Sequence, residues 1–283
     1  MKRDVYTYKK ALNRIGVSYV GNVAHSAKTS LSYKKGTMTY CIYLAPYTMA
    51  GVVNGRQINV CPNSRWCRDN CLNGSGHNRS DILARGTGGS HINQARVKKT
   101  RMFYEDRDLF MKTIICEIKR WQRRADLMNY EFSIRLNGTS DLSPEAFKIG
   151  GKNILELFPN VQFYDYTKVH GRIELLGKYS NYDLTFSYNG HNWATCRKFI
   201  ERGGNVAVVF ASEKKLPRTY RGIPVVDGNE DDMRYKDHKG VVIGLHYHRT
   251  ANDYTTQDGV RVFKMPENGF VVADNDNNCD WGY

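Results

Sequence analysis

The sequence predicts an α/β fold, a complete or partial TIM-like (β/α) barrel with a long cysteine-bearing loop after its first strand. Short apolar runs recur along the chain, and most are separated by segments long enough for a crossover helix. These runs carry Val, Ile and Phe at consecutive positions, which is typical of parallel strands buried on both faces. Eight such runs match the strand number of a barrel.

The first run, CIYLAP, covers residues 41–46 and leads into the long loop. The seven later runs are FSIRL (132–136), VQFYDY (161–166), DLTFSY (183–188), NVAVVFA (205–211), IPVVD (223–227), VVIGL (241–245) and FVVAD (270–274). Residues 1–40 are polar and basic and are expected to form a short helix and an N-terminal cap. Residues 41–283 are then the barrel-like catalytic domain. The segment between Ala211 and Ile223 is short for a crossover helix, which weakens the case for full closure.

Residues 96–127 show a helical period, with apolar side chains on or near one face: Phe103, Phe110, Ile114, Ile118 and Trp121. A further helix is expected to start at Ser143-Pro144-Glu145, because Ser caps helices and Pro suits the first helical position. Gly203-Gly204 is expected to end another helix.

The composition indicates a globular protein that attracts polyanions. The 283 residues are 41% hydrophobic and carry a formal net charge of +14. Such an excess of positive charge favours a nucleic acid or nucleotide partner, although a basic protein without a specific polyanion partner remains an alternative. The sequence contains neither a membrane span nor the apolar core of a signal peptide. We therefore expect a cytoplasmic protein, in the cytoplasm of the host cell if it is phage-encoded.

Three cysteines lie close together in the loop, as Cys61-Pro62-(x4)-Cys67-(x3)-Cys71. In a reducing compartment, clustered thiols are candidate ligands rather than disulfide partners. Three thiolates hold three irons of a four-iron cluster (4Fe-4S) and leave one iron open. Alternatively they hold zinc together with a histidine such as His77 or His91.

Polar residues follow several of the predicted strands, where a β/α barrel gathers its chemistry. They are Asn137, Gly138, Thr139, Ser140 and Asp141 after the second strand, Asp165 and Lys168 at the third, and Ser187 and Asn189 at the fourth. Together they predict a lined pocket in which Asp141, Asp165 and Lys168 are the catalytic groups and Ser187 and Asn189 contact a cofactor. Taken singly, each has an alternative role in a cap or a turn.

Three other groups have both a functional and a structural interpretation. The carboxylates of Asp227, Glu230 and Asp231 suit Mg²⁺, but a solvated acidic turn is the simpler interpretation. His246 and His248 alternate on a strand and either bind metal or phosphate or serve as structural histidines. Basic residues at both ends of the long predicted helix are candidate phosphate contacts or solvated charges: Arg96, Lys98, Lys99, Arg101, Lys119, Arg120, Arg123 and Arg124.

Four motifs resemble a family of uncharacterised proteins found in phages: CPNSRWCRDNC, the segment from Ala95 to Phe103, RLNGTSD and FYDYTK. More distantly, cysteines after strand one and an NG motif after strand two resemble radical SAM enzymes, which use partial β/α barrels. That resemblance implies a cluster on Cys61, Cys67 and Cys71, with S-adenosylmethionine as cosubstrate. It also implies that residues 137–141 bind the methionyl amino group, which assigns Asn137, Gly138, Thr139 and Ser140 to cofactor binding.

The expected function is therefore that of a metal or iron–sulfur dependent enzyme resembling radical SAM proteins and acting on a nucleotide or nucleic acid. Two other functions remain open. One is a zinc-stabilised nucleic-acid-binding protein, in which the cysteine loop is structural. The other is a metal-dependent nuclease or hydrolase that uses the acidic strand ends.

Overall fold

The computed structural model describes residues 2–23, 27–71, 73, 91–212, 215–248, 253–258 and 260–282. The chain divides into two compact units. Unit 1 is drawn from the ranges Met1–Pro62, Gly88–Asp165 and Tyr179–Asp183. Unit 2 is drawn from Asn63–Thr87, Tyr166–Lys178 and Leu184–Tyr283. The expected boundary at residue 40 falls inside a strand of unit 1.

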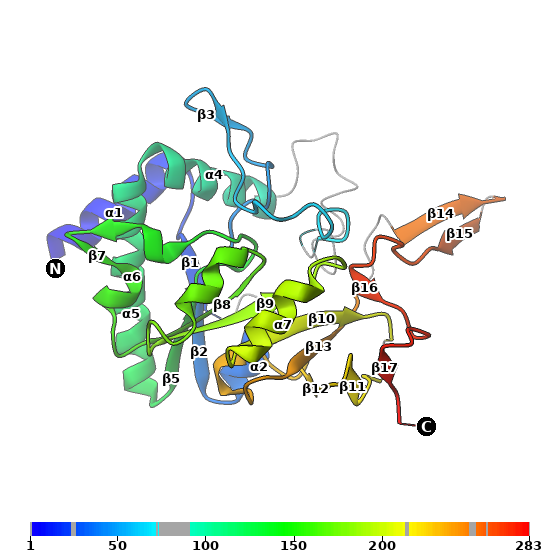
Figure 1. Ribbon diagram of the computed structural model, residues 1–283. Helices are drawn as coiled ribbons and strands as arrows, with labels where there is room; N and C mark the ends of the chain where they lie inside the picture. Colours follow the sequence, from blue (N-terminus) through cyan, green and yellow to red (C-terminus); the bar gives the residue numbers. More distant parts are fainter. Residues whose placement is uncertain are drawn as a thin grey trace. The chain divides into compact units, whose positions relative to one another are not determined.

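Among its described residues, unit 1 contains five α-helices, one of them a single turn, and the first part of the large sheet (Figure 1). Its elements are α1 (Lys2–Ile15), β1 (Gly21–Val23), α2 (Ala27–Lys34), β2 (Thr37–Ile42), β3 (Val52–Val53), β4 (Arg56–Gln57), α4 (His91–Glu105), α5 (Arg107–Met128), β5 (Glu131–Arg135), the 3₁₀ turn η3 (Pro144–Ala146), β6 (Lys148–Ile149), β7 (Lys152–Asn153), the single-turn α6 (Ile154–Leu157) and most of β8 (Gln162–Thr167). The described helices of this unit are thus α1, α2, α4, α5 and α6, and α6 is the shortest.

In its described residues, unit 2 contains the remaining strands and one α-helix, which is nine residues long. Its elements are η4 (His170–Leu175), most of β9 (Tyr182–Ser187), α7 (Trp193–Glu201), β10 (Asn205–Phe210), β11 (Thr219–Tyr220), β12 (Ile223–Asp227), η5 (Arg234–Lys236), β13 (Val242–His246), β14 (Tyr254–Gln257), β15 (Val260–Phe263), β16 (Val271–Val272) and β17 (Cys279–Asp280). None of the helices in the described part of the chain is long and apolar enough to cross a membrane.

The main sheet has 11 strands in the order β1-β2-β5-β8-β9-β10-β13-β12-β11-β17, with β16 paired to β10. Most of its described strand pairings are parallel, including β2 with β5, β5 with β8, β9 with β10, and β10 with β13. The expected α/β class and its largely parallel sheet are therefore confirmed. Each of the eight apolar runs overlaps a strand: β2, β5, β8, β9, β10, β12, β13 and β16.

A closed barrel is not found among the described strands, and the prediction of a complete or partial TIM-like barrel is not confirmed. The outer positions of the sheet order are taken by the short strands β1 and β17, which pair antiparallel with β2 and β11. Strand β13 lies between β10 and β12, so the chain does not add its strands in simple succession. The connection from β10 to β12 contains no crossover helix in its described residues, which agrees with its short length.

The long predicted helix is two helices. Asp106 interrupts it with a non-helical backbone (φ −145°, ψ 76°), and its side chain accepts a hydrogen bond of 3.0 Å from the Leu109 amide. An aspartate that bonds its own neighbouring backbone favours a helix start over a helix interior. Helix α5 then ends at Asn129, which adopts the left-handed conformation (φ 53°). The expected helix at Ser143 is only the three-residue turn η3.

In unit 1, α5 packs on β1, β2 and β5, and α1 and α4 pack on α5. Among the fully buried side chains of this core are Tyr40, Ile118 and Ile134. The core also holds a carboxylate, Glu117, whose oxygens accept hydrogen bonds from the Val20 and Gly21 amides, both 2.9 Å, and from the Tyr40 hydroxyl at 2.6 Å. These three bonds fix the start of β1 to α5 and satisfy the buried charge.

In unit 2, α7 packs on β10, and the rings of Phe186 and Phe199 stack with their centroids 4.4 Å apart. Strand β9 pairs with the first half of β10, while β16 pairs with its last residues, Val209 and Phe210. The carboxyl end of β10 therefore has a late strand of the chain as its neighbour. This arrangement brings residues 268–272 to the carboxyl ends of the parallel strands.

Candidate functional site

The turn after β5 is built around Asn137 and Asp165 in unit 1. The Asn137 amide and side-chain amide donate to the two oxygens of Asp165, at 2.8 and 3.1 Å, and the Tyr182 hydroxyl donates to Asp165 at 3.1 Å. Asn137 Oδ1 accepts from the Ser140 hydroxyl and the Leu142 amide. The structure thus gathers three predicted site residues, Asn137, Ser140 and Asp165, in one buried network that shapes the turn.

Gly138 lies where no side chain fits. A Cβ atom there would come within 2.7 Å of the Ile42 carbonyl oxygen and 2.8 Å of both Cys41 Sγ and Tyr43 Cδ1. The glycine of the NG motif therefore lets the turn approach the end of β2. Thr139 adds a second link, because its hydroxyl donates to the Leu44 carbonyl at 2.5 Å.

Cys61 lies against this turn. Its Sγ atom is 3.6 Å from the Thr139 carbonyl oxygen, and the neighbouring Asp141 amide donates to the Val60 carbonyl at 2.7 Å. Both contacts lie within unit 1. The start of the cysteine loop, which we define as residues 61–71, is therefore held beside the turn that follows β5.

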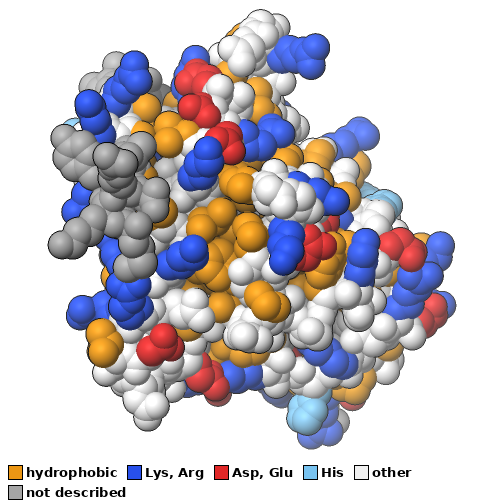
Figure 2. Space-filling view, turned by 90° about the vertical axis from the view of Figure 1, so that its left-hand side faces the viewer, with side chains coloured by type: hydrophobic (Ala, Val, Ile, Leu, Met, Phe, Trp, Pro, Cys, Tyr) orange, Lys and Arg blue, Asp and Glu red, His pale blue; other side chains and the backbone are white. Residues whose placement is uncertain are grey.

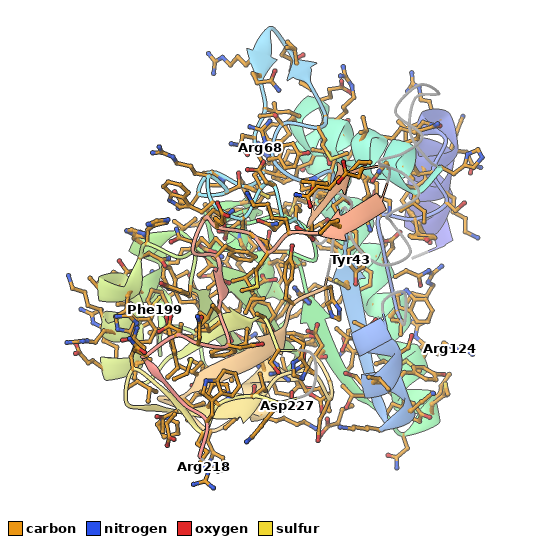
Figure 3. The ribbon with its side chains drawn as sticks, turned by 90° about the vertical axis from the view of Figure 1, so that its right-hand side faces the viewer. Tyr43, Arg68, Arg124, Phe199, Arg218 and Asp227 are labelled. Atoms are coloured by element: carbon orange, nitrogen blue, oxygen red, sulfur yellow. The ribbon has the colours of Figure 1, made fainter. Side chains whose placement is uncertain are left out.

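Within unit 2 the rest of the cysteine loop is fixed by side chains that stand between the cysteines. Asn63 Nδ2 donates to the carbonyl of Lys168, just beyond β8, at 2.9 Å. The ring of Trp66 packs against the ring of His191, which follows β9, with centroids 4.1 Å apart. Asn70 Nδ2 donates to the Tyr247 hydroxyl, which follows β13, at 2.9 Å. Each anchor therefore lies at the carboxyl end of a parallel strand (the loop carries Arg68, labelled in Figure 3).

The Asn70 anchor belongs to a closed hydrogen-bond network. Asn70 Nδ2 also donates to Asp253 Oδ1 at 3.1 Å, and the Tyr247 hydroxyl donates to Asp253 Oδ2 at 2.7 Å. Asn268 Nδ2 donates to Asn70 Oδ1 at 3.0 Å and to the Trp66 carbonyl at 2.9 Å. Because Asn70, Tyr247 and Asp253 are at least nine-tenths buried, this network is costly to disrupt.

All three thiols of the loop are partly exposed, whereas Cys41 and Cys196 are buried. Cys67 Sγ lies 3.7 Å from the Ser64 carbonyl oxygen in its own loop. In the described part of the chain, no three His, Cys, Asp or Glu side chains are gathered as a metal site. His77 lies outside the described residues, and His91 is exposed on α4. The metal centre stays a prediction.

The remaining predicted pocket residues lie in unit 2. The Lys168 ammonium lies over the ring of Phe270, 5.9 Å from its centroid. The Ser187 carbonyl accepts from Asn192 Nδ2, and the Asn189 amide donates to Asn192 Oδ1. Ser187 and Asn189 thus take part in the turn that leads into α7, and their predicted contact with a cofactor is not tested.

The acidic and histidine groups have structural partners. Asp227 Oδ1 accepts from the amide and side chain of Asn229, and Asp231 Oδ1 accepts from the Met233 amide. Glu230 and His248 are exposed. His246 Nδ1 lies 2.6 Å from the Ser212 carbonyl oxygen. These contacts agree with the simpler interpretation of both groups, namely turns and a structural histidine.

The eight basic residues noted in the sequence divide into two kinds. Lys119, Arg120, Arg123 and Arg124 on α5 and Lys98 on α4 are exposed, and Arg101 is partly exposed. Arg96 and Lys99, by contrast, are only 8% and 7% exposed. Burial of two cations one helical turn apart was not foreseen, since basic runs are usually solvated.

Sequence reasoning also missed Trp66, Asn70, His191, Tyr247 and Asn268. The first two lie between the cysteines of the motif, where the thiols are the stronger functional signal. The others are ordinary loop residues without a local signal. Only the fold brings the segment before β16 back to the strand ends.

Comparison with protein families gives one match. A family model described as Gene product 88 matches residues 13–259. This range covers most of both units and includes all three loop cysteines and the NG turn. Comparison with curated proteins and with solved structures gives no match.

Proposed function

The chain belongs to the Gene product 88 family, and we propose that it is an enzyme acting on a nucleotide or nucleic acid, with the cysteine loop as the ligand of an iron–sulfur cluster or zinc. One observation carries the proposal. The loop is anchored to strand ends by Asn63, Trp66 and Asn70, while its thiols remain partly exposed. A loop held at the strand ends by residues other than its cysteines leaves the cysteines available for chemistry.

The donor set suits a soft metal. Cys61, Cys67 and Cys71 supply three sulfur ligands within eleven residues, and thiolates bind iron–sulfur clusters and zinc. The buried thiol of Cys196 differs, because burial raises its pKa to about 12 and keeps it protonated. The proposal includes a change of loop conformation on metal binding, because the described residues hold no ready-made group of three ligands.

The choice of substrate rests on charge. The net charge of +14 attracts phosphate-bearing molecules over distances beyond direct contact. On the face that Figure 2 displays, Lys and Arg side chains are spread around the surface with Asp and Glu among them, rather than gathered in one patch. Such a distribution supports attraction of a polyanion more than recognition of one base sequence.

Anaerobic purification followed by iron, sulfide and zinc analysis tests the proposal. Iron and sulfide in similar amounts support a cluster, and make binding of S-adenosylmethionine the next question, in line with the resemblance to radical SAM enzymes. One zinc per chain supports the zinc form, which is also the form expected of a nucleic-acid-binding protein with a structural loop. A chain that retains neither metal, and takes up neither on reconstitution, contradicts the proposal.

A further inference from the structure

Helix α4 directs two cations toward the interior of unit 1. Arg96 and Lys99 are one turn apart on this helix and therefore face the same side. The next residue, Thr100, accepts a hydrogen bond from the Ala45 amide at 2.9 Å, which fixes that side of the helix over the segment following β2. Burial of both side chains is thus a consequence of how α4 is attached.

Each cation faces an aromatic ring. The Lys99 ammonium lies 4.6 Å from the ring centroid of Tyr19, and the Arg96 guanidinium carbon lies 5.5 Å from that of Tyr43. Tyr43 directly follows β2 and is labelled in Figure 3. The ring of Tyr43 is held by the close approach of Gly138, where a Cβ would meet its Cδ1 atom at 2.8 Å. The NG turn therefore helps to position the ring beneath Arg96.

The positive charge of Lys99 is poorly balanced by nearby carboxylates. Glu117 is the acidic group that acts on it, but the oxygens of Glu117 are already bonded to the Val20 and Gly21 amides and to Tyr40. Within the part of the chain that the structure describes, the Lys99 ammonium has no ion pair or hydrogen bond. A buried ammonium without an acceptor is unfavourable.

An oxyanion would supply the hydrogen-bond acceptor and the negative charge that Lys99 lacks. A phosphate group accepts several hydrogen bonds and carries the negative charge that the Lys99 ammonium lacks beside it. Arginine binds it through two donors and lysine through a point charge, while the aromatic faces favour both cations. We infer that Arg96 and Lys99, flanked by Tyr19 and Tyr43, form a binding site for a phosphate group in unit 1.

This inference deepens the substrate part of the proposed function but does not depend on the metal. Metal analysis tests the proposed role of the cysteine loop, whereas phosphate binding tests the proposed site on α4. Each proposal can therefore fail without the other. A phosphate site in unit 1 predicts a phosphate-bearing small molecule or a nucleic-acid backbone as the natural ligand.

Calorimetric titration with inorganic phosphate tests the site, with ionic strength held constant by sodium chloride. Lys99→Met should weaken binding at least tenfold. Lys98→Met is the matched control, because Lys98 is the adjacent residue and is exposed, and it should change the affinity less than twofold. Equal weakening in both variants would indicate diffuse attraction to a basic protein and would overturn the site, as would the absence of phosphate binding to the unaltered protein.

A second measurement tests the site without any substitution. In the unaltered protein, amine labelling followed by mass spectrometry compares Lys99 with Lys98 in phosphate and in chloride. Phosphate should slow the labelling of Lys99 several-fold, because a bound anion favours its charged form and covers it. Labelling of both lysines that is unaffected by phosphate would contradict the site.

Discussion

Asn70 and Asn268 are joined by a hydrogen bond of 3.0 Å across 198 residues of sequence. This bond links the middle of the cysteine loop to the segment that precedes β16. Asn70 uses both polar atoms of its side chain in this way, since its Nδ2 donates to Tyr247 and Asp253. The position of the loop in unit 2 is therefore set by side chains other than its cysteines.

Asn70→Asp should release the loop from this network. The new carboxylate would replace the Nδ2 donor and would face Asp253, so a hydrogen bond would become a repulsion between buried groups. We expect a loss of about 2 kcal/mol or more of stability and faster hydrogen exchange in residues 63–71. Asn63→Ala is the comparison, because it removes an exposed anchor of the same loop and should cost well under 1 kcal/mol. Equal exchange in both variants would contradict the larger role of the buried Asn70 network.

Asp165→Asn should destabilise the NG turn. Both Asp165 oxygens accept hydrogen bonds, so an amide nitrogen at either position would meet a donor. The expected cost is about 1–3 kcal/mol, measured by denaturant unfolding.

Asp141→Asn is the comparison. Asp141 is only partly buried, and the variant should retain its stability within about 1 kcal/mol while losing ligand binding. Unchanged binding of every ligand would remove Asp141 from the site.

Gly138→Ala should be costly because of the atoms that surround its Cα. The added methyl would contact the Ile42 backbone oxygen at 2.7 Å, and a backbone atom cannot move aside cheaply. We expect about 1–3 kcal/mol of destabilisation, read from thermal or denaturant unfolding. Gly171→Ala is matched, since Gly171 has nothing within 4 Å of the new atom and no positive φ. If both variants unfold at the same denaturant concentration, the close packing of the turn is refuted.

Lys99 should make stability depend on pH. Burial lowers the pKa of Lys99 from 10.5 to about 8. The positive charge of Arg96 lowers this pKa further, whereas Glu117 and Cys41 raise it. The unfolded chain therefore binds more protons than the folded chain between about pH 8 and 10.5, so the free energy of unfolding rises with pH across that window. At pH 7, Lys99→Met should be more stable than the unaltered protein by roughly 1–3 kcal/mol.

That advantage of Lys99→Met should shrink as the pH increases from 8 to 10. Comparison of the two proteins at each pH cancels the titration of the groups that they share. The free energies of unfolding in urea measure the difference. A difference that is constant with pH would mean that Lys99 is not a buried titrating amine.

The strands were predictable from the sequence because a fully buried strand has a local signal, a run of consecutive apolar residues. Runs such as NVAVVFA consist of apolar residues at consecutive positions, and each such run forms a strand. The order of the strands has no such signal. The place of β13 between β10 and β12 depends on contacts far apart in the chain, so the expected barrel did not follow from the strand count.

The candidate site was predictable to a similar extent. Asn137 and Ser140 follow β5 and Asp165 lies in the second half of β8, so the parallel pairing of these strands brings them together. Their mutual hydrogen bonds, which give them a structural role in the turn, depend on side-chain directions that a sequence does not specify. The burial of Arg96 and Lys99 likewise depends on which face of α4 packs against α5 and the segment after β2.

Metal content in two cysteine variants tests the central claim most directly. Cys67 lies in the anchored loop, whereas Cys116 is equally a partly exposed cysteine but lies on α5. After identical anaerobic purification and reconstitution, Cys67→Ser should lose most of the iron or zinc, and Cys116→Ser should retain the amount found in the unaltered protein. Equal metal content in the two variants, whether full or absent, would contradict the assignment of the cysteine loop as the metal-binding element.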